Sequence, residues 1–414
     1  MQIVEMGKLA KRASYRLAGL PSGIKNGALD AVADALEKNA GVIIEANKKD
    51  IGNAAENGIA AAMIDRLRLT EERIKAIADG VRQVRELNDP IGETVKMWQH
   101  PNGMEIGQKR VPLGVIAIIY ESRPNVTVDA AVLCLKTSNA VILRGGKEAI
   151  NSNKAIMKVM QEAAYSAGIP EGALNLVEDT SRESAKELMC LNGYVDVLIP
   201  RGGKGLIKSV VENATVPVIE TGAGNCHIYV DEKYDADMAV DILINAKTSR
   251  PSVCNAAETL LVHKEAAEEF LPSAFAALRE KGVEIRGCEE CMRICPDINK
   301  ASDEDFYTEY NDYIISVKVV DSLDAAIEHI NRHNTKHSEA IITTDYNNAR
   351  KFLDRVDAAA VYVNASTRFT DGFEFGFGAE IGISTQKMHA RGPMGLNELT
   401  TTKYVIYGNG QIRE

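Results

Sequence analysis

The 414-residue chain lacks any apolar run close to the roughly 18 residues that a membrane-spanning helix needs. Its first residues, Met1 to Glu5, lack the charged, apolar and small-residue pattern of a secretion signal. Neither charge sign forms a tail: acidic and basic residues are mixed, and the formal net charge is −10. These absences predict a cytoplasmic protein whose partners include neither nucleic acid nor membrane.

The chain has seven cysteines, an odd number that fits reduced thiols better than a disulfide framework. Three of them, Cys288, Cys291 and Cys295, stand together in "CEECMRIC". This spacing raises the alternative of a module that binds zinc or an iron–sulfur cluster, but no paired CxxC or nearby histidine completes four ligands. We therefore expect no metal site and interpret the segment as a solvated charged loop.

A change of pattern near residue 100 indicates an α/β fold. The first 90 residues have apolar residues at three- to four-residue spacing, which predicts several amphipathic helices. Short apolar runs then alternate with helix-like segments; the runs are 111–120, 140–146, 173–179, 195–203 and 216–222. Such strands predict a parallel sheet covered on both faces. A second α/β pattern follows residue 223, with a helix over 235–247, a strand over 258–263 and a helix over 264–282.

Arg-Gly-Gly-Lys occurs twice, in "VILRGGKEAI" (141–150) and in "LIPRGGKGLI" (198–207), between a predicted strand and a predicted helix. Glycine brings backbone N–H groups close to an anion, and the helix N-terminus and the flanking cations add positive potential. We interpret both as phosphate-binding turns, with tight turns that carry solubilising charges as the alternative. Neither is a GxGxxG fingerprint or a Walker P-loop, so a standard dinucleotide or ATP site is not indicated.

Cys254 stands in "TSRPSVCNAAET", in the predicted loop between the helix 235–247 and the strand 258–263. Its neighbours Ser252 and Asn255 are polar, unlike the lining of a buried structural cysteine. Loops held by rigid elements often carry catalytic groups, so Cys254 is a candidate nucleophile. An inert thiol is the alternative.

Two further polar residues lie near predicted strand ends upstream of Cys254: Asn125 after the run 111–120, and Glu220 in the run 216–222. This order of Asn, Glu and loop Cys resembles the aldehyde dehydrogenase superfamily. Within it, the chain resembles the gamma-glutamyl phosphate reductase (glutamate-5-semialdehyde dehydrogenase) family. The resemblance is carried by "VPLGVIAIIYESRPNVTVDAA", "IETGAGNCHIYVD", "EHINRHNTKHSEAI", "VNASTRFTDGFEFGFGAEIGIST" and "KMHARGPMGLNELTT". It covers essentially the whole chain, and we expect a reductase without a fused amino-acid kinase domain.

The resemblance implies a phosphorylating oxidoreductase that reduces L-glutamyl 5-phosphate to L-glutamate 5-semialdehyde with NADPH, in the second step of proline biosynthesis. It implies Cys254 as the nucleophile that forms a thioester, and Asn125 with the Cys254 N–H as donors to the carbonyl oxygen. Glu220 is expected to move protons or orient the nicotinamide, with a structural role as the alternative. A functional link to glutamate 5-kinase is also implied.

The resemblance places the NADP(H) contacts in the two Arg-Gly-Gly-Lys turns and at a ribose-binding glutamate. These cofactor residues are Arg144, Lys147, Arg201, Gly202, Gly203 and Glu309. The α-carboxylate of the substrate suits a planar guanidinium. Arg368 is the first choice for this contact, with Arg250 and Arg391 as further candidates.

An aldehyde-dehydrogenase-like architecture follows from the same resemblance. It has a Rossmann-type NADP(H)-binding domain over residues 1–222, interrupted by a β-hairpin over 99–112, and a catalytic domain over 223–370. A return segment and oligomerisation tail occupy 371–414, ending in the edge-strand pattern "TTKYVIYGNGQIRE". Hairpin and tail pair across subunits in this superfamily, so we expect a homo-oligomer, a dimer or larger. The alternatives are an aldehyde-oxidising or acyl-CoA-reducing relative and a catalytically silent scaffold.

Overall fold

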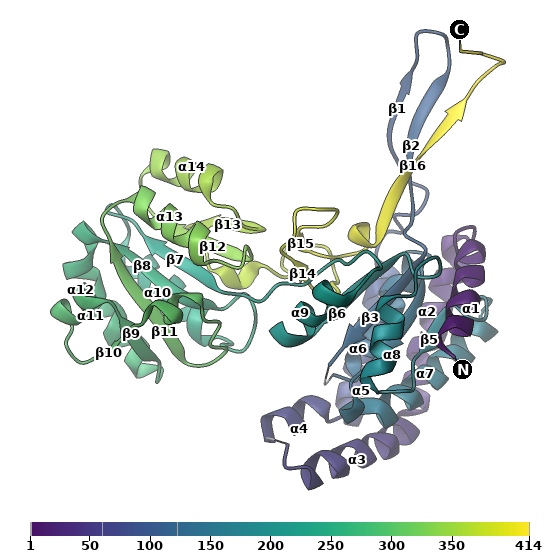
Figure 1. The fold of residues 1–414 in the computed structure, drawn as a ribbon, viewed down its shortest axis with the longest axis horizontal. Helices are drawn as coiled ribbons and strands as arrows, with labels where there is room; N and C mark the ends of the chain where they lie inside the picture. The colour runs from purple at the N-terminus through teal and green to yellow at the C-terminus, as the bar shows by residue number, and fades with distance from the viewer. Residues whose placement is uncertain (1, 60, 122, 414) are drawn as a thin grey trace. The chain divides into compact units, whose positions relative to one another are not determined.

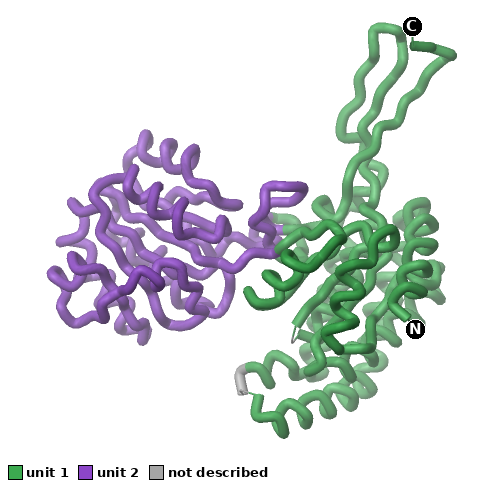
Figure 2. Tube along the Cα trace, in the orientation of Figure 1, with its two compact units in different colours: residues 1–220, 376–382, 394–414 green, residues 221–375, 383–393 purple. Residues whose placement is uncertain are grey.

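The computed structural model describes residues 2–59, 61–121 and 123–413, and the chain divides into two compact units (Figure 2). Unit 1 comprises residues 1–220, 376–382 and 394–414, and unit 2 comprises 221–375 and 383–393. The return segment is thus shared between the units. The functions predicted for residues 1–222 and 223–370 stay predictions. Within the described ranges, no helix has both the length and the apolar content to cross a membrane.

Helices fill the first 90 residues of unit 1, as predicted. They are α1 (Ile3–Leu17), α2 (Ser22–Lys38), α3 (Ala40–Glu56), α4 (Ala61–Leu67) and α5 (Glu71–Glu86). Helix α1 illustrates why they form: its apolar residues at helical spacing, Ile3, Met6, Ala10 and Leu17, are all buried. Thr70 caps α5 by accepting a hydrogen bond from the Arg73 N–H at 3.2 Å.

A parallel sheet with strand order β5-β4-β3-β6 forms the centre of unit 1 (Figure 1). Its strands are β3 (Val115–Tyr120), β4 (Ala140–Arg144), β5 (Leu174–Leu176) and β6 (Val197–Arg201), and its helices are α6 (Asn125–Lys136), α7 (Ile150–Ser166), α8 (Arg182–Met189) and α9 (Lys204–Asn213). Strand β3 is buried at every residue, which requires cover on both faces. Ile119 is in register with Arg144, and Tyr120 with Arg201. The chain therefore leaves β3, β4 and β6 at the same edge of the sheet.

The predicted strand over 216–222 was wrong. Val218 forms only an isolated bridge with Leu198. Leu198 donates its N–H to the Pro217 carbonyl at 2.8 Å and accepts from the Ile219 N–H at 3.0 Å. Because Pro217 has no N–H to offer, pairing does not extend into a full strand.

The hairpin and tail form a separate antiparallel sheet of order β1-β2-β16. Its strands are β1 (Thr94–Gln99), β2 (Glu105–Pro112) and β16 (Thr400–Tyr407), so the edge strand predicted for the tail is confirmed. The hairpin predicted over 99–112 begins earlier, at Thr94. Strand β1 is exposed at all its residues, so it has no buried face, and the prediction placed the hairpin by its turn and the residues that flank it.

Unit 2 contains a parallel sheet of order β10-β9-β11-β8-β7-β12-β13. The strands are β7 (Cys226–Val230), β8 (Ala257–His263), β9 (Glu284–Gly287), β10 (Asn299–Lys300), β11 (Ile314–Val320), β12 (Ser338–Ile342) and β13 (Ala360–Val363). The helices are α10 (Ala236–Thr248), α11 (Lys264–Glu280), α12 (Glu289–Ile294), α13 (Leu323–His333) and α14 (Tyr346–Arg355). Elements α10, β8 and α11 confirm the predicted helix, strand and helix. A short hairpin, β14 (Ile383–Ser384) with β15 (Gly392–Pro393), also belongs to unit 2.

The unit 2 sheet has an apolar core on each face. Ile228 and Val230 of β7 pack with residues of α10 and α11, including Leu243 and Phe270. Tyr229, between them in sequence, packs in a second cluster with residues of α13 and α14. Successive residues of a strand point to opposite faces, so one apolar strand supplies both cores.

The segment "CEECMRIC", interpreted above as a solvated loop, is mostly helical and covers part of this core. Helix α12 spans Glu289–Ile294, and Cys291 is fully buried. Cys288 and Cys295 pack partly buried against the same cluster. Their spacing of three and four residues around Cys291 forms one helical face, and the intervening charges occupy the other.

Candidate active site

Cys254 is partly exposed and lies in the loop between α10 and β8, as predicted. A buried ion pair joins the two ends of this loop: Lys247 Nζ lies 2.6 Å from Glu258 Oε2, and neither side chain is exposed. Burial lowers the pKa of Lys247 and raises that of Glu258 to about 7, while their mutual attraction opposes both shifts. The second carboxylate oxygen of Glu258 accepts the Asn311 N–H at 3.1 Å. The loop therefore has fixed ends.

Asn255, the residue after Cys254, is buried and holds the loop against residues 367–370. Its amide donates to the carbonyl oxygens of Arg368 (3.2 Å) and Thr370 (3.1 Å). Its own carbonyl accepts from the Thr367 hydroxyl at 2.7 Å. The guanidinium of Arg368 donates to the Asn255 side-chain oxygen. This network places Arg368 directly beside the loop that carries Cys254.

The signature segment around Gly224 packs against the same loop from another side. Cys226 is fully buried, and its thiol donates to the Cys254 carbonyl at 3.2 Å. A Cβ at Gly224 would overlap that carbonyl, so the close approach requires glycine. The Gly224 N–H donates to Glu309 Oε1 at 2.8 Å. Glu309, a predicted cofactor residue, is thus half-buried next to the cysteine loop.

The predicted substrate arginines differ in their surroundings. Arg368 is half-buried, and burial, helped by the positive charge of Arg250, lowers its pKa. Arg250 is exposed, four residues before Cys254. Arg391, the third candidate, donates to Asp357 at 2.6 Å, a carboxylate that also receives Lys387 at 2.9 Å. Arg368 and Arg250 are therefore near the cysteine loop, whereas Arg391 belongs to a separate ion-pair cluster.

In unit 1, Asn125 begins α6 just beyond the end of β3. Its side-chain amide donates one N–H to Asp129 Oδ2 at 2.9 Å. Burial raises the pKa of Asp129 to about 6, against the opposing effects of Asn125 and of the Arg201 charge. Glu220, the last residue of the first segment of unit 1, is half-buried.

In the first Arg-Gly-Gly-Lys turn, Arg144 and the backbone N–H groups that follow the turn already have hydrogen-bond partners within the protein. Arg144 donates to the carbonyl oxygens of Thr180 (2.7 Å) and Ser181 (2.9 Å). The helix N–H donors that follow the turn are occupied by Asp50, which accepts from Asn151 N–H at 3.2 Å and Ser152 N–H at 2.8 Å. The side chain of Lys147 is exposed. Of the two cations predicted here, only Lys147 extends into solvent.

The second turn binds an anionic group of the protein itself. Gly202 and Gly203 are exposed, and the Gly203 N–H donates to Glu121 Oε2 at 2.9 Å at the start of α9. A Cβ at Gly202 would overlap this carboxylate. Arg201 ends the preceding strand. The backbone N–H of this turn thus donates to a negatively charged carboxylate oxygen. A phosphate oxygen is also negatively charged and suits the same donor.

Sequence reasoning missed the residues that hold these groups in place, namely Lys247, Glu258, Asp129 and Glu121. A signal was available for two of them. Lys247 and Glu258 are charges within the otherwise apolar ends of a helix and a strand, on either side of the cysteine loop. Buried charges at such positions need a partner, which would have predicted the pair.

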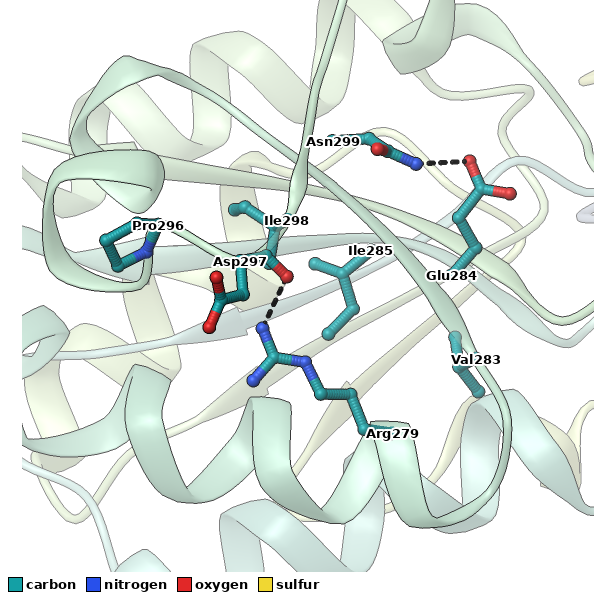
Figure 3. A pocket seen from close by; sticks show the side chains of 8 residues that line it. All are labelled: Arg279, Val283, Glu284, Ile285, Pro296, Asp297, Ile298 and Asn299. Carbon is teal, nitrogen blue, oxygen red and sulfur yellow. Dashed lines mark hydrogen bonds between the residues drawn. The ribbon is translucent and has the colours of Figure 1, made fainter.

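A hollow of about 290 Å³ lies at the β9–β10 edge of unit 2 (Figure 3), and none of the residues that line it is a predicted site residue. Arg279 crosses it and donates to the Asp297 carbonyl at 2.6 Å, and Asn299 donates to Glu284 at 3.1 Å. The side chains of Arg279 and Asn299 are thus bound to other residues of the lining. The hollow does not define the active site.

Comparison with known proteins identifies the family. The family model "Aldehyde dehydrogenase family" matches residues 1–313 and 307–405. A gamma-glutamyl phosphate reductase of Clostridium perfringens is 64% identical over 412 residues, covering 100% of this chain and 99% of the relative. One of Caldicellulosiruptor bescii is 63% identical over 416 residues with the same coverage. The crystal structure of gamma-glutamyl phosphate reductase from Thermotoga maritima superimposes with a TM-score of 0.99 at 50% identity, covering both chains completely.

The chain belongs to the aldehyde dehydrogenase family of α/β oxidoreductases. Within that family it belongs to the gamma-glutamyl phosphate reductases. The fold class and the resemblance inferred from the sequence are both confirmed.

The buried ion pair generates a first prediction. Replacing Lys247→Met or Glu258→Leu alone leaves one charge buried without its partner and should lower the free energy of unfolding by about 3–5 kcal/mol. The double variant should lose less than the sum of the two single losses, because no lone charge remains. Urea denaturation of the four proteins measures this coupling. Strictly additive losses would show that the two side chains do not stabilise each other.

Proposed function

We propose that this enzyme reduces L-glutamyl 5-phosphate to L-glutamate 5-semialdehyde with NADPH and releases phosphate, through a thioester on Cys254. Full-length similarity to gamma-glutamyl phosphate reductases supports the substrate and the place in proline biosynthesis. The observation that carries the mechanism is the partly exposed Cys254 on a loop fixed at both ends. The enzyme would act in the cytoplasm on an acyl phosphate of the kind that glutamate 5-kinase makes.

The Cys254 thiolate attacks the acyl carbon, so a C–S bond forms and the C–O bond to phosphate breaks. Phosphate leaves with the electron pair. When bound, NADPH would supply a hydride to the thioester carbon, and the Cys254 thiolate would leave as the aldehyde forms. Both steps place negative charge on the carbonyl oxygen, which the second N–H of the Asn125 amide and the Cys254 N–H stabilise. The first amide N–H of Asn125 is bound by Asp129, which fixes the orientation of the side chain.

The second Arg-Gly-Gly-Lys turn fits the phosphate groups of NADPH, since it already binds the carboxylate oxygen of Glu121. Arg201, Gly202 and Gly203 would hold the cofactor there. In the first turn, Lys147 would contact the 2′-phosphate, and Arg144 would hold the shape of the turn through Thr180 and Ser181.

The remaining assignments concern the nicotinamide end and the substrate. Glu309 would bind ribose with the carboxylate oxygen that does not accept from Gly224. Glu220 would orient the nicotinamide or move protons. Arg368 would receive the α-carboxylate of the substrate, with Arg250 adding positive charge.

The enzyme would work as a homo-oligomer, a dimer or larger. The β1-β2-β16 sheet exposes apolar side chains that a second copy would cover. They are Val95, Met97, Trp98, Tyr404, Ile406 and Tyr407. An exposed edge strand and an apolar surface of this kind favour association.

Replacement of the nucleophile tests the mechanism. Cys254→Ser should lower kcat by roughly 10³-fold or more, because a serine hydroxyl is scarcely ionised near neutral pH. NADPH binding, followed by fluorescence titration, should be unchanged. The matched control is Cys226→Ser, whose hydroxyl still donates to the Cys254 carbonyl, and it should keep most of its activity. Near-normal turnover of Cys254→Ser would refute the assignment.

The cofactor turns generate the next prediction. Lys147→Ala should raise the KM for NADPH about tenfold more than the KM for NADH, since it removes ~1.4 kcal/mol of binding to the 2′-phosphate. Arg144→Ala should raise both KM values alike, because it loosens the turn itself. Steady-state kinetics with each cofactor measure the two ratios. Equal effects of Lys147→Ala on both cofactors would contradict the assignment of this lysine.

The proposed assembly can be tested by removing residues 403–414. This truncation removes the β16 partners of residues 105–109 and exposes that edge of β2, so the protein should dissociate or aggregate. Sedimentation velocity would report the change of mass. If mass and activity both stay unchanged, the tail has no part in an assembly.

A further inference from the structure

Cys288 and Cys291 form a pair of thiols that the reductase mechanism does not use. Their sulfur atoms lie 3.6 Å apart, across the first turn of α12. Cys288 is partly exposed, whereas Cys291 is fully buried. Cys295, the third cysteine of the segment, follows the end of α12. The two sulfurs in contact thus differ in access to solvent.

The surroundings of the pair favour a thiolate on the exposed member. The Val319 N–H donates to Cys288 Sγ at 3.5 Å, and Cys291 Sγ lies 3.6 Å from the Val317 carbonyl oxygen. The hydrogen bond with Cys291, against the effect of burial, lowers the pKa of Cys288 to about 5. The hydrogen bond with Cys288 and burial raise the pKa of Cys291. Cys288 is thus suited to attack a disulfide first, and Cys291 is placed to react with Cys288 in a second step.

We propose that Cys288 and Cys291 form a reversible dithiol–disulfide site that exchanges with low-molecular-weight disulfides such as oxidised glutathione. The Cys288 thiolate attacks one sulfur of the small disulfide, which forms a mixed disulfide and releases one small thiolate. Cys291 then loses its proton and attacks Cys288 Sγ, which expels the second small thiolate. Overall, two protein thiols are oxidised by two electrons, and one small disulfide becomes two thiols.

The geometry suits the formation of a disulfide bond between Cys288 and Cys291. Bond formation brings the sulfurs from 3.6 Å to about 2.05 Å, a movement within the reach of side-chain rotation. Because Cys291 is buried, its nearest electrophile is the sulfur on Cys288 and not a molecule in solution. Among the residues that the structure describes, no three His, Cys, Asp or Glu side chains gather in a way that could hold a metal ion. The arrangement therefore fits a two-sulfur site.

The site is separate from the proposed catalytic centre. Cys288 directly follows the carboxyl end of β9, whereas Cys254 precedes the amino end of β8 in the same parallel sheet. Its chemistry therefore does not depend on the proposed reductase function, and it can be tested without a turnover assay.

Trypsin digestion separates Cys295 from the pair Cys288 and Cys291. Cleavage after Arg286, Arg293 and Lys300 places Cys288 and Cys291 in the peptide 287–293 and Cys295 in the peptide 294–300. The full-length protein is treated with oxidised glutathione, quenched in acid, alkylated under denaturing conditions and digested. Mass spectrometry should find peptide 287–293 lighter by two hydrogen atoms and not alkylated, while Cys295 is alkylated. Dithiothreitol before alkylation should restore two alkylated thiols.

Single variants test the order of the two steps. Cys291→Ser should stop at the mixed disulfide and retain glutathione on Cys288. Cys288→Ser should leave Cys291 a thiol, because the buried sulfur is not attacked from solution. The matched control Cys295→Ser should close the disulfide like the wild type. Alkylation of both Cys288 and Cys291 in the oxidised wild type, or a disulfide that includes Cys295, would overturn the proposal.

Discussion

The buried ion pair between Lys247 and Glu258 is the constraint on which the arrangement around Cys254 depends. It joins the last turn of α10 to the start of β8, and everything between them belongs to the cysteine loop. Two buried charges are costly to desolvate, so the pair is stable only if both are fully partnered. Glu258 meets this condition by also accepting the Asn311 N–H, two residues after Glu309. One carboxylate therefore links the loop of the proposed nucleophile to the segment of the proposed ribose ligand.

The two units contribute different chemistry from different edges of their sheets. In unit 1, β4 and β6 end at Arg144 and Arg201 at the carboxyl edge of the sheet, and Asn125 follows the end of β3 at the same edge. In unit 2, the proposed nucleophile and Glu309 lie near the amino ends of β8 and β11. Under the proposed mechanism, unit 1 would supply the groups for anion and oxyanion binding, and unit 2 would supply the nucleophile.

Much of the fold could be predicted from the sequence because apolar runs and helical spacing report burial directly. The predictions failed where the pattern of apolar residues does not match the burial or the pairing of the segment. Strand β1 is exposed along its whole length, and the run 216–222 is apolar but contains Pro217, which prevents extended pairing. In "CEECMRIC" the charged residues suggested a loop, although the cysteines themselves form the buried face of a helix.

For the candidate site, the sequence predicted individual residues but not the contacts that hold them in place. Resemblance to a family predicted Cys254, Asn125 and Glu309 as site residues, and their roles stay predictions. The supporting contacts were not predictable, since they join residues far apart in the chain, such as Gly224 to Glu309 and Asn255 to Arg368. The two Arg-Gly-Gly-Lys turns also differ in their contacts: Arg144 of the first donates to backbone carbonyls, whereas the second binds Glu121. The repeated motif is the same in both, so the sequence did not predict this difference.

The central claim is that Cys254 carries the glutamyl group as a thioester, and a single-turnover experiment without NADPH tests it most directly. Enzyme mixed with L-glutamyl 5-phosphate and quenched in acid should release one equivalent of phosphate. Mass spectrometry should then find the glutamyl group on the tryptic peptide 248–264, which contains Cys254 and no other cysteine. A glutamyl group on a peptide with another cysteine, or phosphate release without any protein adduct, would contradict the account.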